Sequence, residues 1–243
     1  MLKKIAILCL LTVLASYFVV AVTVLNKPEI GVVCSEVDVF VGDSTQMVFL
    51  GEEEVMELLN REGCNPIGER LEDISLAKIE KSLHDHPYVN KAIAYKTPGG
   101  KIHIILRQRK PVLNVMAADG QSYFLDNNGD MMPKLIYTLD LAVATGTISP
   151  IYAQQHLLPL ACMIQDDPFW NHQILQIHVS EKGEIELVPR VGGHTILLGQ
   201  PENMEKKLNR MKAFYKKGLN KVGWNKYSTI SLKYDNQIVC KKK

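Results

Sequence analysis

The segment HPYVNKAIAYKTPGGKIHIILRQRKP, residues 86–111, decides the fold of the chain. Residues 89–95 and 102–106 are strand-like runs within it, and residues 97–100 (TPGG) separate them. Proline presets φ for a turn and glycine takes positive φ without steric cost, so this tetrapeptide has the chemistry of a turn. The segment therefore predicts two consecutive strands joined by a tight turn.

Two helices and a strand are predicted upstream of this segment. Residues 52–62 are rich in helix formers with Gly63 as a stop, and a second helix starts with Ser75 as N-cap and ends before Pro87. Before them, EVDVFV at residues 36–41 alternates acidic and apolar side chains, as a half-buried strand does. The order strand, helix, helix, strand, strand predicts a compact α+β unit.

After Pro111 the sequence is dominated by strand signals. Two turn dipeptides, at 119–120 (DG) and 128–129 (NG), favour tight hairpins. Further strands are predicted at residues 173–179, 184–189 and 195–198. An amphipathic helix is predicted from Pro201 at position N1, with an apolar stripe made of Met204, Leu208, Met211, Tyr215 and Leu219.

An insertion at residues 134–171 separates the hairpins from the later strands. It contains a predicted helix near residues 151–164, which Pro159 weakens because proline removes a helical hydrogen bond. At the other end, residues 230–234 alternate between apolar and polar and are followed by QIVC at 237–240. The second half of the chain is therefore expected to be a β-rich domain with a C-terminal amphipathic helix and a terminal edge strand.

A run of 21 residues without charge, Ile5 to Leu25, lies near the N-terminus. As a helix it would be about 32 Å long, which matches a hydrocarbon core of about 30 Å. A cleaved signal peptide is the alternative, but its apolar region is normally about 7–15 residues long, and no small-x-small site ends this run. A single transmembrane helix is therefore predicted, with Lys3 and Lys4 placing the short N-terminus in the cytoplasm.

The overall charge is close to neutral but unevenly distributed. With 28 Lys and Arg against 26 Asp and Glu, and 47% apolar residues, the composition disfavours a disordered chain and a nucleic-acid binder. Residues 201–243 nevertheless carry 12 Lys and Arg against 3 Asp and Glu. Most of these charges fall on the polar side of the amphipathic helix, so a solvated face is favoured over a lipid or nucleic-acid patch.

Two short motifs contain residue types that bind metal ions. His84-Asp85-His86 offers two imidazoles, but residues two apart on a helix point to different sides, and a zinc pair prefers positions i and i+4. The segment DNNGD, 126–130, opens like a calcium loop, yet Met131 stands where that loop needs glycine. We therefore predict a polar helix end and a hairpin turn, with no metal.

Other chemical signatures are absent from the sequence. It contains no nucleophile elbow, phosphate loop or dinucleotide fingerprint, so no cofactor and no enzymatic activity are predicted. The scattered histidines His172, His178 and His194 leave a membrane-tethered hydrolase as an alternative, because a triad can assemble in space. The five cysteines lack C-x-x-C spacing, which favours structural or unpaired thiols.

Four segments together resemble one family. They are HPYVNKA (86–92), IHIILRQRKP (102–111), SYFLDNNG (122–129) and SLKYDNQ (231–237). In this order, after an N-terminal span, they resemble the FtsQ/DivIB bacterial cell-division family, whose first outer unit is a POTRA domain. The sequence departs from the family pattern at Ser231 and Lys233, where aspartate and arginine are usual, and in the insertion.

The resemblance implies a non-enzymatic, bitopic division scaffold at the septum of the bacterial inner membrane, with its bulk in the periplasm. It implies FtsB- and FtsL-like single-span partners, and recruitment of other septal proteins by the POTRA-like unit. The expected parts are a cytoplasmic tail (1–4), a transmembrane helix (5–25), a linker (26–35), a POTRA-like domain (36–110) and a partner-binding β domain (111–243). A POTRA-bearing chaperone-like module in secretion or outer-membrane assembly is the alternative within this architecture.

In the family the partner docks along the last strands. By position in the motif, this role carries over to Tyr234, Asn236 and Gln237. Their neighbours Ile230, Leu232 and Ile238 complete the expected partner-binding set. Ile230 and Leu232 are expected to belong to the core, whereas residues 234–237 are expected at an exposed sheet edge.

Overall fold

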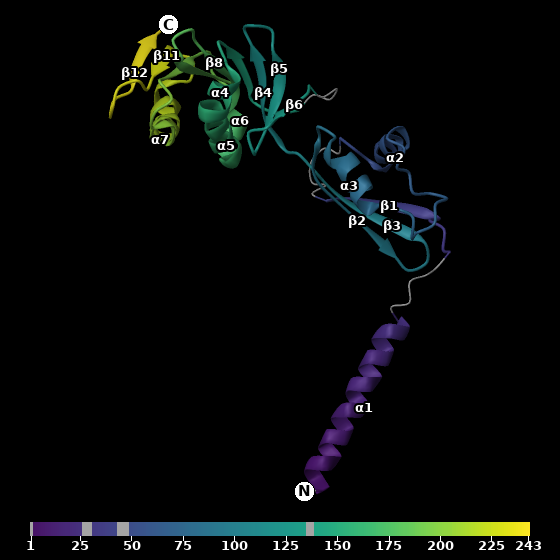
Figure 1. Ribbon diagram of the computed structural model, residues 1–243. Helices are drawn as coiled ribbons and strands as arrows, with labels where there is room; N and C mark the ends of the chain where they lie inside the picture. Colours follow the sequence, from purple (N-terminus) through teal and green to yellow (C-terminus); the bar gives the residue numbers. More distant parts are fainter. Residues whose placement is uncertain (1, 26–30, 43–48, 135–138) are drawn as a thin grey trace. The chain divides into compact units, whose positions relative to one another are not determined.

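The computed structural model describes residues 2–25, 31–42, 49–134 and 139–243. The side chains of residues 2–9 and 22–25 lie outside this description, as does half of the predicted linker, 26–30. The chain divides into two compact units, Met1–Gln108 and Arg109–Lys243 (Figure 1). The division falls two residues before the domain boundary expected from the sequence.

The first element, helix α1 (Leu2–Leu25), covers the predicted membrane span. Its described side chains between Leu10 and Val20 are exposed. Within the part of the chain that the structure describes, no helix meets the combined length and apolarity required to cross a membrane. The membrane span therefore stays a prediction.

The rest of the first unit is a three-stranded sheet covered on one face by two helices. The elements are β1 (Glu36–Gly42), α2 (Glu52–Arg61), α3 (Leu76–His84), β2 (Val89–Thr97) and β3 (Lys101–Gln108). The sheet order is β1-β3-β2, with β1 parallel and β2 antiparallel to β3. Buried side chains of both helices, such as Leu59 and Ile79, pack with Ile102 and Ile104 of β3. The predicted order of strands and helices is confirmed.

Local interactions explain why these elements start and stop where they do. The Ser75 side chain accepts a hydrogen bond from the Lys78 N–H, so it is the N-cap of α3 as predicted. The β2–β3 turn uses positive φ at Gly99 (89°) and Gly100 (82°), a conformation that favours glycine. Across the unit, Glu80 Oε1 accepts the Ala94 N–H at 2.8 Å and fastens α3 to strand β2.

The second unit contains a nine-stranded sheet in the order β12-β11-β10-β9-β8-β7-β4-β5-β6. Its strands are β4 (Pro111–Ala117), β5 (Ser122–Asp126), β6 (Met131–Met132), β7 (Val143–Gly146), β8 (Ile174–Val179), β9 (Ile185–Pro189), β10 (Thr195–Gly199), β11 (Tyr227–Ser231) and β12 (Val239–Lys242). The helices are α4 (Pro150–Tyr152), α5 (Leu158–Asp166), α6 (Pro168–Gln173), α7 (Met204–Phe214) and α8 (Asn220–Val222), with π-helical segments η1 (Ala153–Leu157) and η2 (Tyr215–Leu219). Helices α4 to α7 lie on one face of the sheet (Figure 1).

The insertion contributes a central strand that the sequence analysis did not predict. Strand β7 pairs in parallel with β4, where Asn114 faces Val143, and with β8, where Val143 faces Gln176. The helix expected at residues 151–164 is present and longer, running from α4 through η1 into α5. Its π-helical turn ends directly before Leu158-Pro159, where proline lacks the N–H of a regular helix.

Two predicted boundaries near the C-terminus are wrong. Helix α7 begins at Met204 rather than Pro201, because its N-cap Asn203 adopts a left-handed conformation with φ 54° and turns the chain there. The alternation at residues 230–234 does not continue as a strand. Instead β11 ends at Ser231, and Tyr234 to Gln237 form the connection to β12.

Gly146 gives a test of the central position of β7. Its φ is +103°, and an added Cβ would overlap the carbonyl oxygen of Val179 on β8. We predict that Gly146→Ala lowers the free energy of unfolding by about 3 kcal/mol, from backbone strain plus overpacking. Gly120→Ala is the control, because Gly120 has φ +90° but open space around its Cβ position, and it should cost about 1 kcal/mol.

Both tryptophans, Trp170 and Trp224, lie in the second unit, so urea unfolding followed by tryptophan fluorescence measures this unit alone. Equal losses of stability in the two variants would contradict the tight β7–β8 contact.

Candidate partner-docking edge of the second unit

Strand β12 forms one edge of the nine-stranded sheet. It pairs antiparallel with β11, where Ser231 faces Val239 and Ile230 faces Cys240. On its other side, no strand of the described residues lies next to it. An unpaired strand edge presents backbone N–H and C=O groups to which another chain can add a strand.

A hollow of about 600 Å³ lies beside β12. Its lining residues come from the last three strands and the β11–β12 connection: Leu197, Thr229, Ser231, Lys233, Tyr234, Val239, Cys240 and Lys241. Side chains alternate between the faces of a strand, so Ser231 lies on the face opposite the buried Ile230. We call β12, the connection 233–238 and this hollow the C-terminal edge site.

The structure places the predicted partner-binding residues at two depths. Ile230 and Leu232 are 0% exposed and belong to the hydrophobic core, as expected, so they support the edge from beneath. Tyr234 is 59% exposed, and Asn236 and Gln237 are exposed beside it. Partly buried side chains packed against the core include that of Ile238. The exposed residues therefore lie in the loop before the edge strand.

The sequence placed the terminal edge strand at residues 237–240, so it overlaps β12 (Val239–Lys242) in two of the four residues. The strand continues through Lys241 and Lys242, which the sequence did not indicate because lysine is depleted in strands. The turn at Asp235-Asn236 was the available signal. Asn236 has φ 57°, which marks a tight reversal and places the strand after it.

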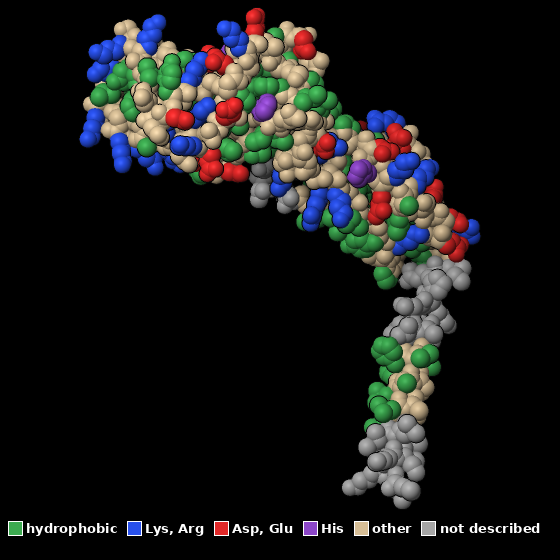
Figure 2. All heavy atoms as spheres, turned by 60° about the vertical axis from the view of Figure 1, so that its left-hand side comes forward, with side chains coloured by type: hydrophobic (Ala, Val, Ile, Leu, Met, Phe, Trp, Pro, Cys, Tyr) green, Lys and Arg blue, Asp and Glu red, His purple; other side chains and the backbone are tan. Residues whose placement is uncertain are grey.

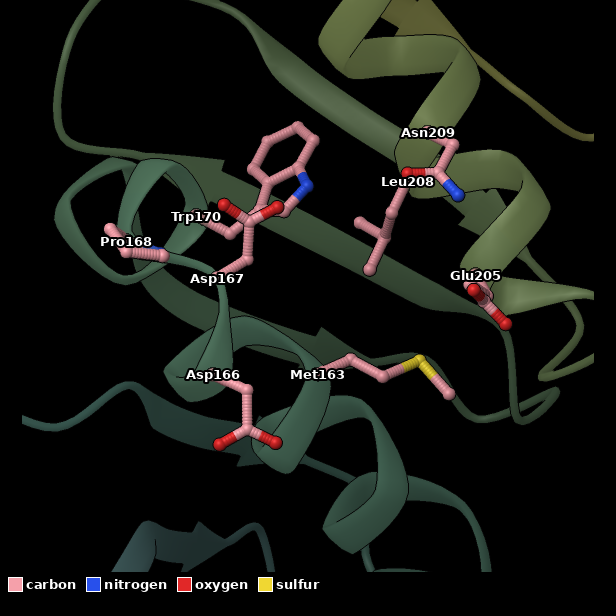
Figure 3. A pocket seen from close by; sticks show the side chains of 8 residues that line it. All are labelled: Met163, Asp166, Asp167, Pro168, Trp170, Glu205, Leu208 and Asn209. Atoms are coloured by element: carbon pink, nitrogen blue, oxygen red, sulfur yellow. The ribbon is translucent and has the colours of Figure 1, made fainter.

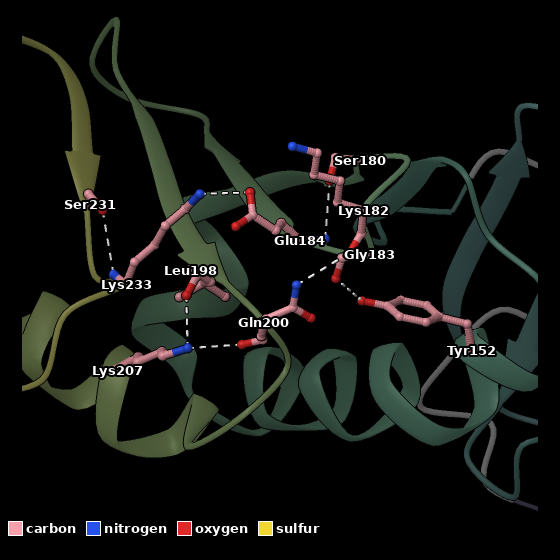
Figure 4. A network of polar contacts seen from close by, with 10 residues as sticks. All are labelled: Tyr152, Ser180, Lys182, Gly183, Glu184, Leu198, Gln200, Lys207, Ser231 and Lys233. Atoms are coloured by element: carbon pink, nitrogen blue, oxygen red, sulfur yellow. Dashed lines mark hydrogen bonds and ion pairs between the residues drawn. The ribbon is translucent and has the colours of Figure 1, made fainter.

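Lysine and arginine side chains brace the connection against the scaffold. Lys233 Nζ lies 2.7 Å from Glu184 Oε2, which ties the loop to the region just before β9 (Figure 4). Arg210 of α7 donates from Nη2 to the Leu232 carbonyl at 2.9 Å. The start of the loop is therefore held from two directions.

A second set of contacts links α7 to the ends of the strands. Lys207 Nζ donates to the carbonyls of Leu198 at 2.8 Å and Gln200 at 2.9 Å (Figure 4). Burial lowers the pKa of Lys207. The chain of contacts continues from Gln200 Nε2 to the Lys182 carbonyl, and Tyr152 donates to the neighbouring Gly183 carbonyl. These contacts fix the end of β10 that adjoins the site.

A buried polar pair lies below the C-terminus. The Nε2 of His194 and the Tyr215 hydroxyl are 2.7 Å apart in a hydrogen bond, and His194 is 4% exposed. Its Nδ1 has no partner among the described residues. Burial, and then the charge of Lys243, lower the pKa of His194, and burial raises the pKa of Tyr215. The pair is therefore neutral near pH 7.

The histidines considered for a hydrolase lie in separate surroundings. His172 Nδ1 is 2.6 Å from the Pro168 carbonyl, and His178 Nδ1 is 3.1 Å from Thr145 Oγ1. His194 bonds Tyr215, as described above. The structure does not bring these three histidines together into one site.

The acidic motifs and cysteines behave as structural features. Asp126 Oδ1 accepts the N–H groups of Asn128 and Asp130, both at 2.9 Å, which confirms the predicted hairpin turn. In the described ranges no cluster of His, Cys, Asp or Glu could hold a metal ion. The described cysteines, Cys34, Cys64, Cys162 and Cys240, are free thiols.

Comparison with known proteins agrees with this architecture. A POTRA-like domain model matches residues 32–107, and the model described as FtsQ/DivIB, C-terminal related, matches residues 110–241. The chain belongs to the FtsQ/DivIB family. It is also similar to the cell division protein FtsQ of Rhodothermus marinus, with 28% identity over 185 residues, which cover 71% of this chain and 67% of that protein.

The two matches fit the two structural units. The POTRA-like match ends one residue before the first unit does, and the FtsQ/DivIB match begins one residue after the start of the second. The FtsQ/DivIB match includes β11 and most of β12. The C-terminal edge site therefore lies within the part of the chain that carries the family relationship.

The different depths of the site residues lead to a stability prediction. Ile230→Ala should lower the free energy of unfolding by about 2–5 kcal/mol, because it leaves a cavity in the core. Tyr234→Ala should stay within about 0.5 kcal/mol of the wild type, because the side chain is exposed. Urea unfolding followed by tryptophan fluorescence measures both. A large loss in the Tyr234 variant would show that this side chain packs.

Because His194 is buried, we predict that the stability of the second unit depends on pH. The pKa of His194 is lower in the folded chain than in the unfolded chain, so the unfolded state binds more protons below about pH 6.5. Stability of the second unit should therefore fall between pH 7.5 and 5.5. His194→Gln, whose side chain does not titrate, should flatten this dependence. An unchanged slope in the variant would exclude His194 as its source.

Proposed function

We propose that the protein is a bitopic division scaffold with residues 5–25 as its membrane anchor, its N-terminus in the cytoplasm and both units outside. Family membership and the uncharged N-terminal run support this proposal. As a member of the FtsQ/DivIB family, it acts at the division septum. It works by holding partners together and not by catalysis.

The free edge of β12 is the observation that carries the proposal. A partner segment adds a strand there, with main-chain hydrogen bonds for affinity and side chains in the adjacent hollow for specificity. Tyr234 is the large exposed aromatic of the site and the expected energetic anchor, since tyrosine is enriched among such residues. The partners are the FtsB- and FtsL-like single-span proteins that the family relationship suggests.

The basic charge of the site favours partner segments that carry acidic residues. Lys and Arg side chains gather around the end of the second unit that carries β12 and α7 (Figure 2). Lys241, Lys242 and Lys243 are exposed at the edge itself. Opposite charges across an interface speed association and fix register, so the added partner strand is flanked by acidic residues. The first unit recruits other septal proteins independently of this edge.

Removing the edge tests the proposal. A chain lacking residues 239–243, and separately Tyr234→Ala, should each bind the extracytoplasmic segments of the FtsB- and FtsL-like partners at least about tenfold more weakly. Biolayer interferometry with the immobilised partner pair measures this. Phe40→Ala is the matched control, because Phe40 is an aromatic exposed to a similar degree (65%) in the first unit.

Tryptophan fluorescence must show that the second unit of each variant stays folded. Undiminished binding by the shortened chain would contradict strand addition at β12. A fluorescent fusion that forms no ring during division would contradict the septal role as a whole.

A further inference from the structure

A groove lies on the helix-covered side of the second unit, between the α5–α6 junction and the start of α7 (Figure 3). Its volume is about 460 Å³. The lining residues are Met163, Asp166, Asp167, Pro168, Trp170, Glu205, Leu208 and Asn209. We call it the helix-face groove. It lies on the opposite side of the sheet from the hollow of the C-terminal edge site.

The base of the groove is apolar with one open donor. Trp170 and Leu208 are 1% and 3% exposed, and Met163 lies beside them. The Trp170 indole nitrogen is turned toward the α7 side of the groove (Figure 3). Within the described ranges the indole N–H forms no hydrogen bond, and although the side chain as a whole is buried, its nitrogen is not among the enclosed atoms without a partner, so it is open to the groove. An indole N–H that is open to the groove fits a ligand that brings an acceptor oxygen.

The rim of the groove is acidic. The Asp167 carboxylate already has two partners within the chain: it accepts the Phe169 N–H at 3.0 Å and pairs with Lys212 Nζ at 2.8 Å. Asp166 and Glu205 are exposed and make no ion pair with the described residues. They therefore leave two carboxylates free to meet a cation.

The apolar base and the acidic rim together favour a ligand with an aliphatic stem and a cationic end. A lysine or arginine side chain lays its aliphatic stem along an apolar surface while its charged head stays near the rim. The acidic rim stands out because residues 201–243 carry 12 Lys and Arg against 3 Asp and Glu. The exposed carboxylates at the rim favour a cationic side chain there, although the rest of α7 is basic.

We propose that the helix-face groove binds a short extended segment of a partner protein through one lysine or arginine side chain. The stem lies on Met163 and Leu208, the cation reaches the rim on which Asp166 and Glu205 lie, and a backbone carbonyl of the segment accepts from Trp170 Nε1. Because the C-terminal edge site lies on the other face of the sheet, both sites can be occupied at once. The proposal does not depend on strand addition at β12.

Nuclear magnetic resonance of the indole N–H groups tests the proposal on the full chain in zwitterionic micelles. The sequence has two tryptophans, so ¹⁵N-tryptophan labelling gives two indole signals, which Trp224→Phe assigns. The probe is acetyl-leucyl-arginyl-leucine amide. Its control replaces arginine by norleucine, which keeps an aliphatic stem without the charge.

The arginine probe should shift the Trp170 signal saturably and leave the Trp224 signal in place. The norleucine probe should bind at least about threefold more weakly. Asp166→Asn combined with Glu205→Gln should weaken the arginine probe about threefold to tenfold, because exposed ion pairs contribute modestly. Glu181→Gln, which removes an exposed carboxylate outside the groove, should change nothing.

Two results would overturn the proposal. One is a Trp170 signal that does not respond to the arginine probe. The other is equal binding of both probes, or of wild type and double variant, which would mean that the groove recognises no cation. The substituted residues are exposed, so these variants are expected to fold, and an unchanged Trp224 signal verifies it.

Discussion

The double pairing of β7 is the constraint on which the second unit depends. This four-residue strand is hydrogen-bonded in parallel to β4 on one side and to β8 on the other. Without it, the hairpin of β4 and β5 and the strands from β8 to β12 would form two separate sheets. Parallel pairs need long crossover connections, and here the helices α4 to α6 lie within the crossover from β7 to β8. The helix-face groove and the C-terminal edge site are both built on this nine-stranded sheet, which β7 joins into one.

The first unit could be predicted almost entirely from sequence because its signals are local. The cap at Ser75, the stop before Pro87 and the glycine turn at 97–100 each act over a few residues, and the structure contains them. Strand β7 could not be predicted, since the sequence VATG shows neither alternation nor a buried apolar run. Its conformation is decided by partners about 30 residues away in either direction along the chain. Helix α6 (Pro168–Gln173) was missed although its start has local signals, with Asp167 as N-cap and Pro168 as the first helical residue.

The candidate site was predictable in position but not in detail. The family motif located the last strands, and burial of Ile230 and Leu232 followed from their alternation. The exposed residues 234–237 were expected on the edge strand, but the left-handed Asn236 turns the chain and leaves them in the loop before it. The contacts of Arg210 with the Leu232 carbonyl and of Glu184 with Lys233 join segments far apart in sequence, so no local pattern predicts them. The same holds for the groove, whose two sides come from α5–α6 and α7.

The two ends of the nine-stranded sheet are unlike. At one end β12 offers four residues, whereas at the other end the described strand β6 has only two, Met131 and Met132. A strand edge drives fibre growth when it meets an equally capable edge on the next copy, which makes a head-to-tail contact that never closes. This sheet lacks such a matching pair of edges. Strand addition at β12, as proposed, therefore has no four-residue counterpart at the other end of this sheet, which disfavours head-to-tail polymerisation through it.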